Sequence, residues 1–422
     1  MHQPFQQLFS SGKMKPLFKK ILLFNSNISS SPQTGVAIKN TRLRKTIIRF
    51  LDASERATIA ELAAAFHISI PKISSTVQEL IDEGWVGDFG KIDSTGGRRA
   101  NQFGLNADAG FFLGVEVSKY NVTIGLLNFR KTLVKMEHHG GFILENTRES
   151  LQQLIKLVKQ FISKLRGPQK NILRIGMNLA GRINYTSGHS YNYYHFDDEP
   201  LTAIFEKTFG IKTYLDNDTR AMAFGELHAG IVHQEKNILF INLDYGIGVG
   251  IIIDGELFYG KSGFSGEFGH IPFFDNEIIC HCGKKGCLET EASGQALVKL
   301  FREKRKAGAR SSIKASHISL EDIVDACIQD DTLAIECVAQ IGEKLGKGIA
   351  TLINLFNPEL VVLGGILSAT GDHIRLPIQS ALNTYSLSLV NNDTKLEISQ
   401  LGNKAGVTGA CLLVRAKMLA DT

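Results

Sequence analysis

From Gly110 onward the chain alternates between short apolar strands and amphipathic helices, and this order limits the possible folds more than any other feature. Two β-rich runs (FFLGVEVSKYNVTIGLLNF) precede a helix (SLQQLIKLVKQFISKL) and a strand that enters a glycine turn (ILRIGMNLAGRI). A similar cycle follows, with two strands in NILFINLDYGIGVGIIIDG, a long helix over Ala334–Phe356 and a buried strand, ELVVLGG. The order predicts an α/β body of two lobes, whose cleft would suit a small ligand. We expect a closing helix, near Val407–Leu419, to pack back on the first lobe.

Residues 41–106 have a different pattern, with three helices followed by a hairpin. The first helix, in LRKTIIRFLDA, has one apolar face. The second begins at Thr58, with Glu61 placed to complete a capping box, and the third begins at Ser69 with Pro71 in its first turn. Two strand-like runs, WVGDFG and ANQFGLN, are joined by the basic segment KIDSTGGRR. The pattern predicts a winged helix-turn-helix domain.

The third helix of this domain would present short polar side chains that suit phosphates and base edges in a major groove. Two arginines at the hairpin tip would contact a minor groove or phosphates. The predicted DNA-binding residues are Lys72, Ser74, Ser75, Thr76, Gln78, Arg98 and Arg99. The alternative is a small helical interaction domain with a solvated loop, because the charge of this segment alone does not indicate DNA binding.

Residues 1–40 form a basic N-terminal arm, with five lysines and no acidic residue in a chain whose net charge is +5. Such an arm ahead of a neutral body indicates a polyanionic partner, or a solvated leader or misassigned start codon. No apolar run approaches the roughly 18 residues needed to cross a bilayer, so no membrane partner is expected. Six cysteines in 422 residues do not make a secreted disulfide framework. We therefore expect a cytoplasmic protein.

Three of the six cysteines lie in CHCGKKGCLET, residues 280–290. A Cys-x-Cys pair makes a poor disulfide, because so short a ring strains the torsion about sulfur. Together, His270, Cys280, Cys282 and Cys287 offer the ligand set of a closed tetrahedral zinc site. The alternative is that these residues bind no metal and only fill space in the fold. A bound metal would hold a loop that has few apolar residues of its own, and would fix the neighbouring carboxylates at the cleft.

A second candidate segment is YLDNDTRAMAFGEL, in which a strand end passes into a helix. Asp216 and Asp218 lie at this junction, where aspartate is also a common helix cap. The segment alone therefore does not distinguish a ligand site from capping.

The run GIGVGIIIDGELFYGKSGFSGEFGH, followed ten residues later by CHCGKKGCLE, resembles the ROK family, in its xylose- and N-acetylglucosamine-repressor-like branch. The resemblance extends from about Asn40 onward. The family groups sugar-responsive repressors with sugar kinases of the actin/hexokinase-like fold. It implies an α/β actin/hexokinase-like body behind the winged helix, with lobe 1 in residues 107–232 plus a C-terminal helix at 407–422. Lobe 2, with the zinc site, would span residues 233–406.

The resemblance also implies the ligand residues and strengthens the zinc hypothesis. A sugar would be bound by Asn217, Asp218, Glu267, His270 and Glu289. Asp218 would stand at the position of the kinases' general base, and His270 would serve both the metal and the sugar. Ionised carboxylates accept hydrogen bonds from adjacent hydroxyl groups, which is the chemistry that a pyranose needs.

The phosphate-binding turns of the family's kinases are altered in this chain. Their first loop is Asp-x-Gly-Gly-Thr, and the corresponding stretch here is GVEVSKYN. Phosphates are held by glycine-rich turns whose amides can approach closely, so side chains at these positions leave no place for a phosphoryl donor. The substituted positions are Glu116, Ser118, Lys119 and Tyr120 in the first loop, and Asp244 and Tyr245 in the second.

The sequence therefore predicts a sugar-responsive, DNA-binding transcriptional regulator without enzymatic activity. It would act as a repressor that leaves its operator when a sugar binds, as a homodimer or homotetramer. Two rival hypotheses are an ATP-dependent hexose kinase and an architectural DNA-binding protein that responds to no ligand.

Overall fold

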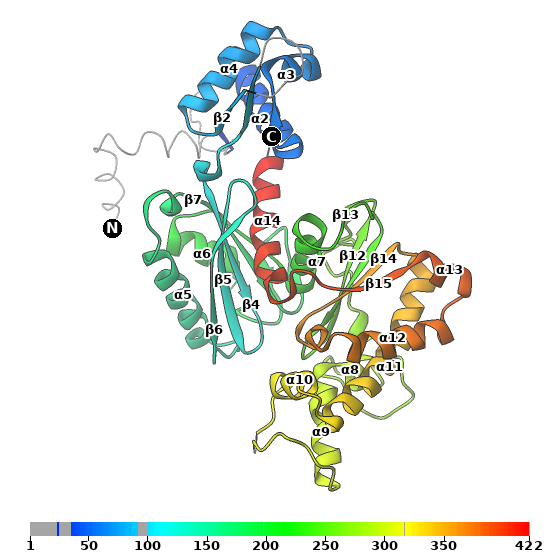
Figure 1. The fold of residues 1–422 in the computed structure, drawn as a ribbon. Coiled ribbons are helices and arrows are strands. Elements are labelled where there is room, and N and C mark those ends of the chain that lie inside the picture. The colour runs from blue at the N-terminus through cyan, green and yellow to red at the C-terminus, as the bar shows by residue number, and fades with distance from the viewer. Residues whose placement is uncertain (1–22, 25–34, 92–99, 197, 316, 422) are drawn as a thin grey trace.

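The structure, a computed structural model, describes residues 23–24, 35–91, 100–196, 198–315 and 317–421 (Figure 1). Most of the predicted N-terminal arm and the tip of the predicted hairpin, with Arg98 and Arg99, lie outside the described residues. Within these ranges, no helix is long and apolar enough to cross a membrane.

The first folded unit is a winged helix-turn-helix, as the sequence predicted. Thr58 accepts a hydrogen bond from the Glu61 amide, and the Glu61 carboxylate accepts one from the Thr58 amide, so the predicted capping box is confirmed. The first helix begins at Gly35, before the predicted start near Thr41. A short strand, β1, pairs with the hairpin to give the strand order β1-β3-β2. The elements are α2 (Gly35–Ser54), β1 (Arg56–Ala57), α3 (Ile59–Phe66), α4 (Ile70–Asp82), β2 (Val86–Lys91) and β3 (Asn101–Leu105).

Lobe 1 is a five-stranded mixed sheet with the order β10-β7-β4-β5-β6. The helices α5 and α6 pack on one face of this sheet; α5 buries Leu151, Leu154, Val158 and Phe161, which recur at helical spacing along one side. The elements are β4 (Phe111–Val117), β5 (Asn121–Asn128), β6 (Leu133–Gly140), α5 (Arg148–Ser163), β7 (Ile172–Leu179), β8 (Ile183–Asn184), β9 (His189–Ser190), α6 (Leu201–Phe209), β10 (Thr213–Asn217) and α7 (Asp218–Ala229).

Lobe 2 repeats this arrangement, with the strand order β13-β12-β11-β14-β15. In both lobes three antiparallel strands are followed by two parallel strands, which confirms the repeated cycle that the sequence predicted. The elements are β11 (Ile238–Leu243), β12 (Ile247–Ile253), β13 (Glu256–Leu257), α8 (Glu289–Ala292), α9 (Gly294–Lys306), α10 (Leu320–Ile328), α11 (Thr332–Phe356), β14 (Leu360–Gly364), α12 (Asp372–Tyr385), α13 (Ser388–Asp393) and β15 (Lys395–Ile398).

The closing helix, α14 (Ala405–Ala420), returns to lobe 1 and covers the sheet face opposite α5 and α6, as predicted (Figure 1). Three glycines, Gly114, Gly125 and Gly176, lie side by side on β4, β5 and β7. A Cβ atom on any of them would collide with α14. The glycine row therefore lets the helix lie directly on the sheet.

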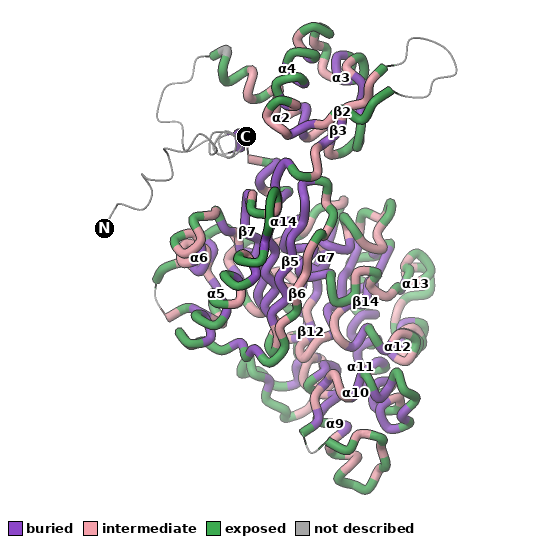
Figure 2. The backbone as a smooth tube through the Cα atoms, turned by 60° about the vertical axis from the view of Figure 1, so that its left-hand side comes forward, coloured by how far each residue is buried: buried purple, intermediate pink, exposed green. Residues whose placement is uncertain are grey.

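The winged helix is packed against lobe 1 rather than tethered to it. One apolar core includes Trp85 of the DNA-binding unit, Phe129 of lobe 1 and Met418 of α14. The described dipeptide Leu23–Phe24 joins the same core, with the Phe24 and Trp85 rings 5.5 Å apart. Figure 2 shows the strands of both lobes as mostly buried, whereas peripheral helices such as α5 and α13 expose their outer turns.

Candidate ligand and metal site

A cavity of about 470 Å³ lies between the two lobes. Lobe 1 contributes the turn after β4 and the first turn of α7, and lobe 2 contributes the turn after β11 and the loop after β13. The lining includes all five residues that the family resemblance assigned to the sugar, which are Asn217, Asp218, Glu267, His270 and Glu289. The fold thus brings residues from three separate segments to one polar cavity of the size that a small ligand needs.

Asn217 and Asp218 begin α7 at the edge of this cavity. The helix cap is Asn217, whose side-chain oxygen accepts from the Arg220 amide at 3.1 Å and whose side-chain nitrogen donates to the Gly181 carbonyl at 3.1 Å. The alternative prediction, in which Asp216 or Asp218 caps the helix, is therefore wrong, because the cap is Asn217. Burial raises the pKa of Asp218 above its ordinary value, although hydrogen bonds from Thr219 oppose this shift.

Asp216 and Arg220 form a buried ion pair that joins the lobes beside the cavity. Their side chains are 2.8 Å apart and about 5% exposed. The hydroxyl group of Tyr259 in lobe 2 donates to Asp216 at 3.1 Å, and Arg220 donates to the carbonyl oxygen of Gly263 in lobe 2 at 2.8 Å. The sequence analysis missed this contact, although the i, i+4 spacing of Asp216 and Arg220 at a helix start was visible.

The four predicted metal ligands, His270, Cys280, Cys282 and Cys287, converge on one point. Their ligand atoms all lie within 4.8 Å of one another. The Sγ atoms of Cys282 and Cys287 are 3.7 Å apart, too far for a disulfide, and Cys280 Sγ lies 3.6 Å from His270 Nδ1. A tetrahedral zinc ion with bonds of about 2.3 Å to sulfur separates two thiolates by about 3.8 Å, so the spacing fits such an ion.

The metal cluster and the cavity share His270. Its Nδ1 atom faces Cys280, whereas its Nε2 atom lies 3.8 Å from the Glu267 carboxylate, on the cavity side. Glu289 follows the last cysteine and accepts from the Ile247 amide at 3.1 Å. His281, which the sequence analysis did not single out, lies 3.0 Å from Glu289 and also lines the cavity. The sequence feature that could have identified His281 is its position between Cys280 and Cys282.

Two comparisons identify the family. Residues 112–417 match the ROK family, and residues 41–86 match a winged helix-turn-helix DNA-binding domain. The chain belongs to the ROK family. The xylose repressor of Caldicellulosiruptor bescii is 30% identical over 354 residues, which are 82% of this chain and 89% of that protein. The transcriptional dual regulator NagC of Escherichia coli K12 is 30% identical over 368 residues, 86% of this chain and 89% of that protein.

Solved ROK structures agree with this assignment. A ROK family transcriptional regulator, a homologue of the E. coli MLC protein, has a TM-score of 0.74 at 27% identity, covering 91% of this chain and 97% of that one. The ROK glucokinase of Streptomyces griseus, with glucose and AMPPNP, has a TM-score of 0.63 at 25% identity, covering 72% and 99%. The regulator therefore matches both parts of this chain, and the actin/hexokinase-like fold prediction is confirmed.

In this ROK protein the turn after β4 and the turn after β11 meet through their side chains. The rings of Tyr120 in lobe 1 and Tyr245 in lobe 2 are 4.8 Å apart, edge to face. The Lys119 ammonium lies over both rings, at 5.3 and 5.6 Å. The Tyr245 hydroxyl group donates to Glu321 at 2.8 Å, which fixes its ring. Bulky side chains of the two lobes therefore meet at these two turns.

Three acidic groups lie close together behind this aromatic pair. Burial and the charges of Asp218 and Asp244 raise the pKa of Glu116 to about 8. Burial also raises the pKa of Asp244 to about 6. Glu116 is therefore protonated at neutral pH in the folded protein, so the ROK body carries fewer charges at its centre than the sequence indicates.

The raised pKa of Glu116 predicts a pH-dependent stability. Between pH 4.5 and about pH 8, Glu116 is deprotonated in the unfolded chain but stays protonated in the folded chain. The free energy of unfolding must therefore fall as pH rises. From pH 5 to pH 7 this fall amounts to about 3 kcal/mol. In Glu116→Gln this contribution should disappear and leave the smaller fall that Asp244 and Asp218 cause, whereas the exposed control Glu256→Gln should keep the full slope. Urea unfolding at both pH values measures the difference, and equal slopes in all three proteins would contradict the assignment.

The predicted DNA-binding residues of α4 do not all face outward. Ser74, Ser75 and Gln78 are exposed, and Lys72 is partly buried and donates to Asn40 at 2.9 Å. The prediction for Thr76 is wrong, because this side chain is 2% exposed. Its hydroxyl group donates to the Lys72 carbonyl at 2.9 Å, which allows a polar residue to lie in the core.

Proposed function

We propose that this ROK protein is a sugar-responsive transcriptional repressor that leaves its operator when a sugar binds between the lobes. The observation that supports this most is the meeting of the five candidate sugar residues at one interlobe cavity, in a chain that also has a winged helix-turn-helix domain. The names of the relatives, a xylose repressor and an N-acetylglucosamine repressor, agree with this function.

The cavity residues would recognise sugar hydroxyl groups. The carboxylates of Asp218, Glu267 and Glu289 would accept hydrogen bonds from adjacent hydroxyls, and the Asn217 side chain can both donate and accept. We propose that His270, Cys280, Cys282 and Cys287 hold a structural zinc ion, which when bound supplies a rigid crosslink in a loop that contains no helix. The Nδ1 atom of His270 would then face the metal and its Nε2 atom the sugar.

A sugar kinase is the second candidate, because Asp218 is present at the position of the general base. We propose that this chain does not phosphorylate its sugar, since Tyr120 and Tyr245 occupy the place where the phosphate loops would approach a nucleotide. A coupled assay with ATP and a sugar panel tests this. Turnover of about 1 per second or faster would favour the kinase.

The regulator hypothesis is tested by linkage between the two ligands. A thermal-shift panel of xylose, glucose, N-acetylglucosamine and their phosphates identifies the sugar that stabilises the protein most. The protein then selects its DNA from a random pool. We expect this sugar to lower the affinity for the selected DNA by roughly 5–150-fold, and the DNA to lower the sugar affinity by the same factor. Independent binding of the two ligands would reject the proposal.

A homodimer would bind DNA through two half-sites, as other winged-helix and helix-turn-helix regulators do. A change in the position of the two winged helices would then alter how well both fit at once. A small structural change in one chain would therefore have a large effect on the affinity for the operator.

Removing the Asp218 charge should weaken the sugar without affecting the DNA. We expect Asp218→Asn to lower the sugar affinity by roughly 10–100-fold, because a hydrogen bond to an ionised group contributes about 1.5–3 kcal/mol. Isothermal titration of the panel sugar measures this effect. The matched control is Asp254→Asn, since Asp254 is exposed in lobe 2 and has a left-handed φ of 53° that asparagine tolerates. Equal sugar affinities in both variants would remove Asp218 from the site.

A further inference from the structure

The helix α14 lies between the ligand cavity and the DNA-binding unit, and it contacts the elements of both. Against α7, the helix that begins with Asn217 and Asp218, it packs through Gly409. A Cβ atom on Gly409 would overlap the backbone oxygen of Ala221 in α7. At this contact the two helices pack backbone against backbone, with no side chain between them that could change its rotamer. We therefore expect α14 and α7 to move together.

On the cavity side, α14 reaches the contact between the lobes through Lys417. The Lys417 ammonium lies 5.3 Å from the ring centres of both Tyr185 and Tyr214. Tyr185 in turn packs against Tyr259 of lobe 2, with ring centres 4.2 Å apart. Tyr259 is also the residue that donates to the buried Asp216. An unbroken series of contacts therefore runs from lobe 2 through Tyr259 and Tyr185 to α14.

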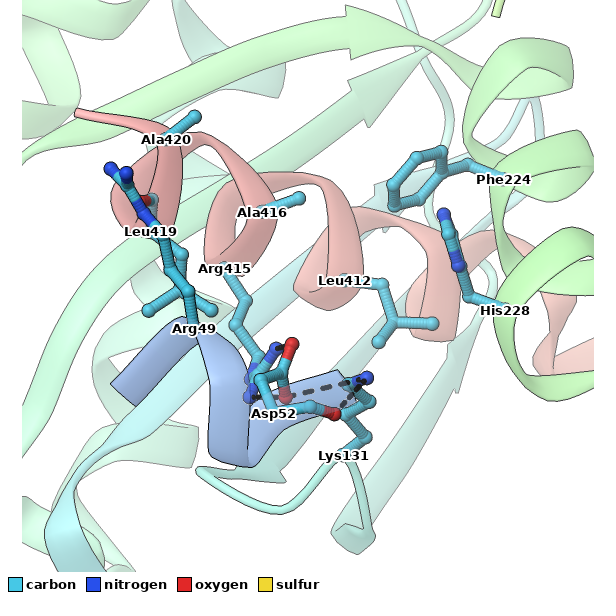
Figure 3. Close-up of a pocket in the computed structure, with 10 residues that line it drawn as sticks. All are labelled: Arg49, Asp52, Lys131, Phe224, His228, Leu412, Arg415, Ala416, Leu419 and Ala420. Atoms are coloured by element: carbon cyan, nitrogen blue, oxygen red, sulfur yellow. Dashed lines mark hydrogen bonds and ion pairs between the residues drawn. The ribbon is translucent and has the colours of Figure 1, made fainter. Parts of the chain in front are cut away.

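On the other side, α14 holds the first helix of the winged-helix unit through polar contacts (Figure 3). Three side chains of α2 take part, and Figure 3 shows two of them, Arg49 and Asp52. Lys45 donates to the carbonyl oxygen of Asp421 at 3.0 Å, and Arg49 donates to that of Leu419 at 2.6 Å. Asp52 accepts from Arg415, with one of the two bonds at 3.1 Å. Basic side chains at a helix C-terminus also interact favourably with its dipole.

These contacts form a polar seam beside the apolar core that the two units share. A groove of about 370 Å³ lies between α2, α7 and α14, and Figure 3 shows Phe224 and His228 of α7 across it from Asp52. On its floor, Asp52 is paired with both Arg415 and Lys131. Water in the groove can replace such polar contacts, whereas the glycine contact between α14 and α7 leaves no room for a side chain. The orientation of the winged helix is therefore the part of this region that can change.

We propose that α14 transmits sugar binding to the DNA-binding domain, with Lys417 responding to the Tyr185–Tyr259 contact and Arg415 setting the position of α2 through Asp52. This inference rests on the proposed function and adds the route of the signal. A sugar that changes the angle between the lobes displaces Tyr259 relative to Tyr185, because the two rings belong to opposite lobes. Lys417 then loses or regains its place over Tyr185, and α14 carries the displacement to α2.

The chain contains its own reporter of this movement. Trp85 is the only tryptophan in the sequence, and it is fully buried where the winged helix meets lobe 1. Its ring lies 5.2 Å from that of Phe129 and 5.5 Å from that of Phe24. Its fluorescence reports on the seam and not on the sugar cavity, so it separates transmission from binding.

The test uses Lys417→Met and Tyr259→Phe in the full chain, with the panel sugar of largest thermal shift as the probe. Neither residue lines the sugar cavity. We expect both variants to bind this sugar within about threefold of the unchanged protein. The factor by which the sugar weakens DNA binding should fall towards 1, and the change in Trp85 fluorescence on sugar addition should shrink with it.

Three further variants control this experiment. Lys417→Arg keeps a cation over Tyr185 and should keep the coupling, which distinguishes transmission from a general loss of fold. Lys156→Met, on the exposed face of α5, and Tyr191→Phe should behave like the unchanged protein. Tyr191 also faces a lobe 2 ring, that of Phe264, at 5.8 Å.

Two results would overturn the inference in distinguishable ways. If the unchanged protein couples sugar to DNA but Lys417→Met and Tyr259→Phe couple equally well, the route is wrong and the proposed function stands. If the unchanged protein shows no coupling, the proposed function fails and the route fails with it.

Discussion

Replacing Cys280 and Cys282 together by serine is expected to abolish metal binding and to weaken the sugar roughly a hundredfold or more. The loop between His270 and Glu289 contains no helix and leaves Ile271, Ile278 and Ile279 exposed, so its shape depends on the metal. Three cavity residues, Glu267, His270 and Glu289, lie next to or among the ligands and would lose their positions together. Elemental analysis measures the metal, and calorimetry measures the sugar.

The matched control for this experiment is Cys327→Ala, which removes a buried cysteine of α10 that lies outside the cluster. This variant should keep one zinc ion per chain and its full sugar affinity. DNA binding without sugar should be unchanged in both proteins, because the apolar core of the described part of the winged helix is shared with lobe 1 and α14 and includes no residue of the metal loop. Full sugar affinity in a metal-free double variant would contradict the role given to the metal.

The second large effect is expected at Gly409, where a single methyl group should destabilise the whole body. In Gly409→Ala the new Cβ atom would overlap the backbone of α7, which cannot rotate away as a side chain can. We expect a loss of about 3 kcal/mol or a failure to fold, since overpacking of this kind costs roughly 1–3 kcal/mol or more. Thermal unfolding measures the loss.

Gly35→Ala is the control for this substitution. Gly35 begins α2, and a Cβ atom there has no neighbour within 4 Å. Alanine is also the better helix former, so this variant should unfold within a few degrees of the unchanged protein or slightly above it. Equal unfolding temperatures for the two glycine variants would mean that α7 and α14 are less tightly packed than the structure has them.

Thr76 was wrongly predicted to face outward because its place in the helical periodicity of α4 was not taken into account. Ile73, Val77 and Leu80 mark the buried face, and Thr76 lies at position i+3 from Ile73, on that same face. The sequence analysis placed it outward because it is polar. The phase of the helix outweighs the polarity of one small side chain, since its hydroxyl group can bond to the preceding turn.

The metal ligands and the interlobe contacts differ in how far the sequence could reveal them. Cys280, Cys282 and Cys287 are close in sequence, and so their spacing alone indicated a site. Arg415 and Asp52 are 363 residues apart, and no local pattern connects them. The same holds for Asp216 and Tyr259, which meet only when both lobes are folded. Long-range polar contacts of this kind depend on the packing of whole elements, which periodicity does not describe.

The position of α14 in the chain has a consequence during protein synthesis. The sheet of lobe 1 is complete in sequence by Asn217, yet the helix that covers its glycine row begins only at Ala405. At ordinary elongation rates the ribosome needs roughly ten seconds or more to make the intervening segment. Throughout this interval the polar contacts that fix α2 on α14 cannot form. A truncated chain would therefore lack the fixed geometry that is required to occupy an operator. Translation of a truncated mRNA would then not produce a repressor that stays on the operator in the presence of the sugar.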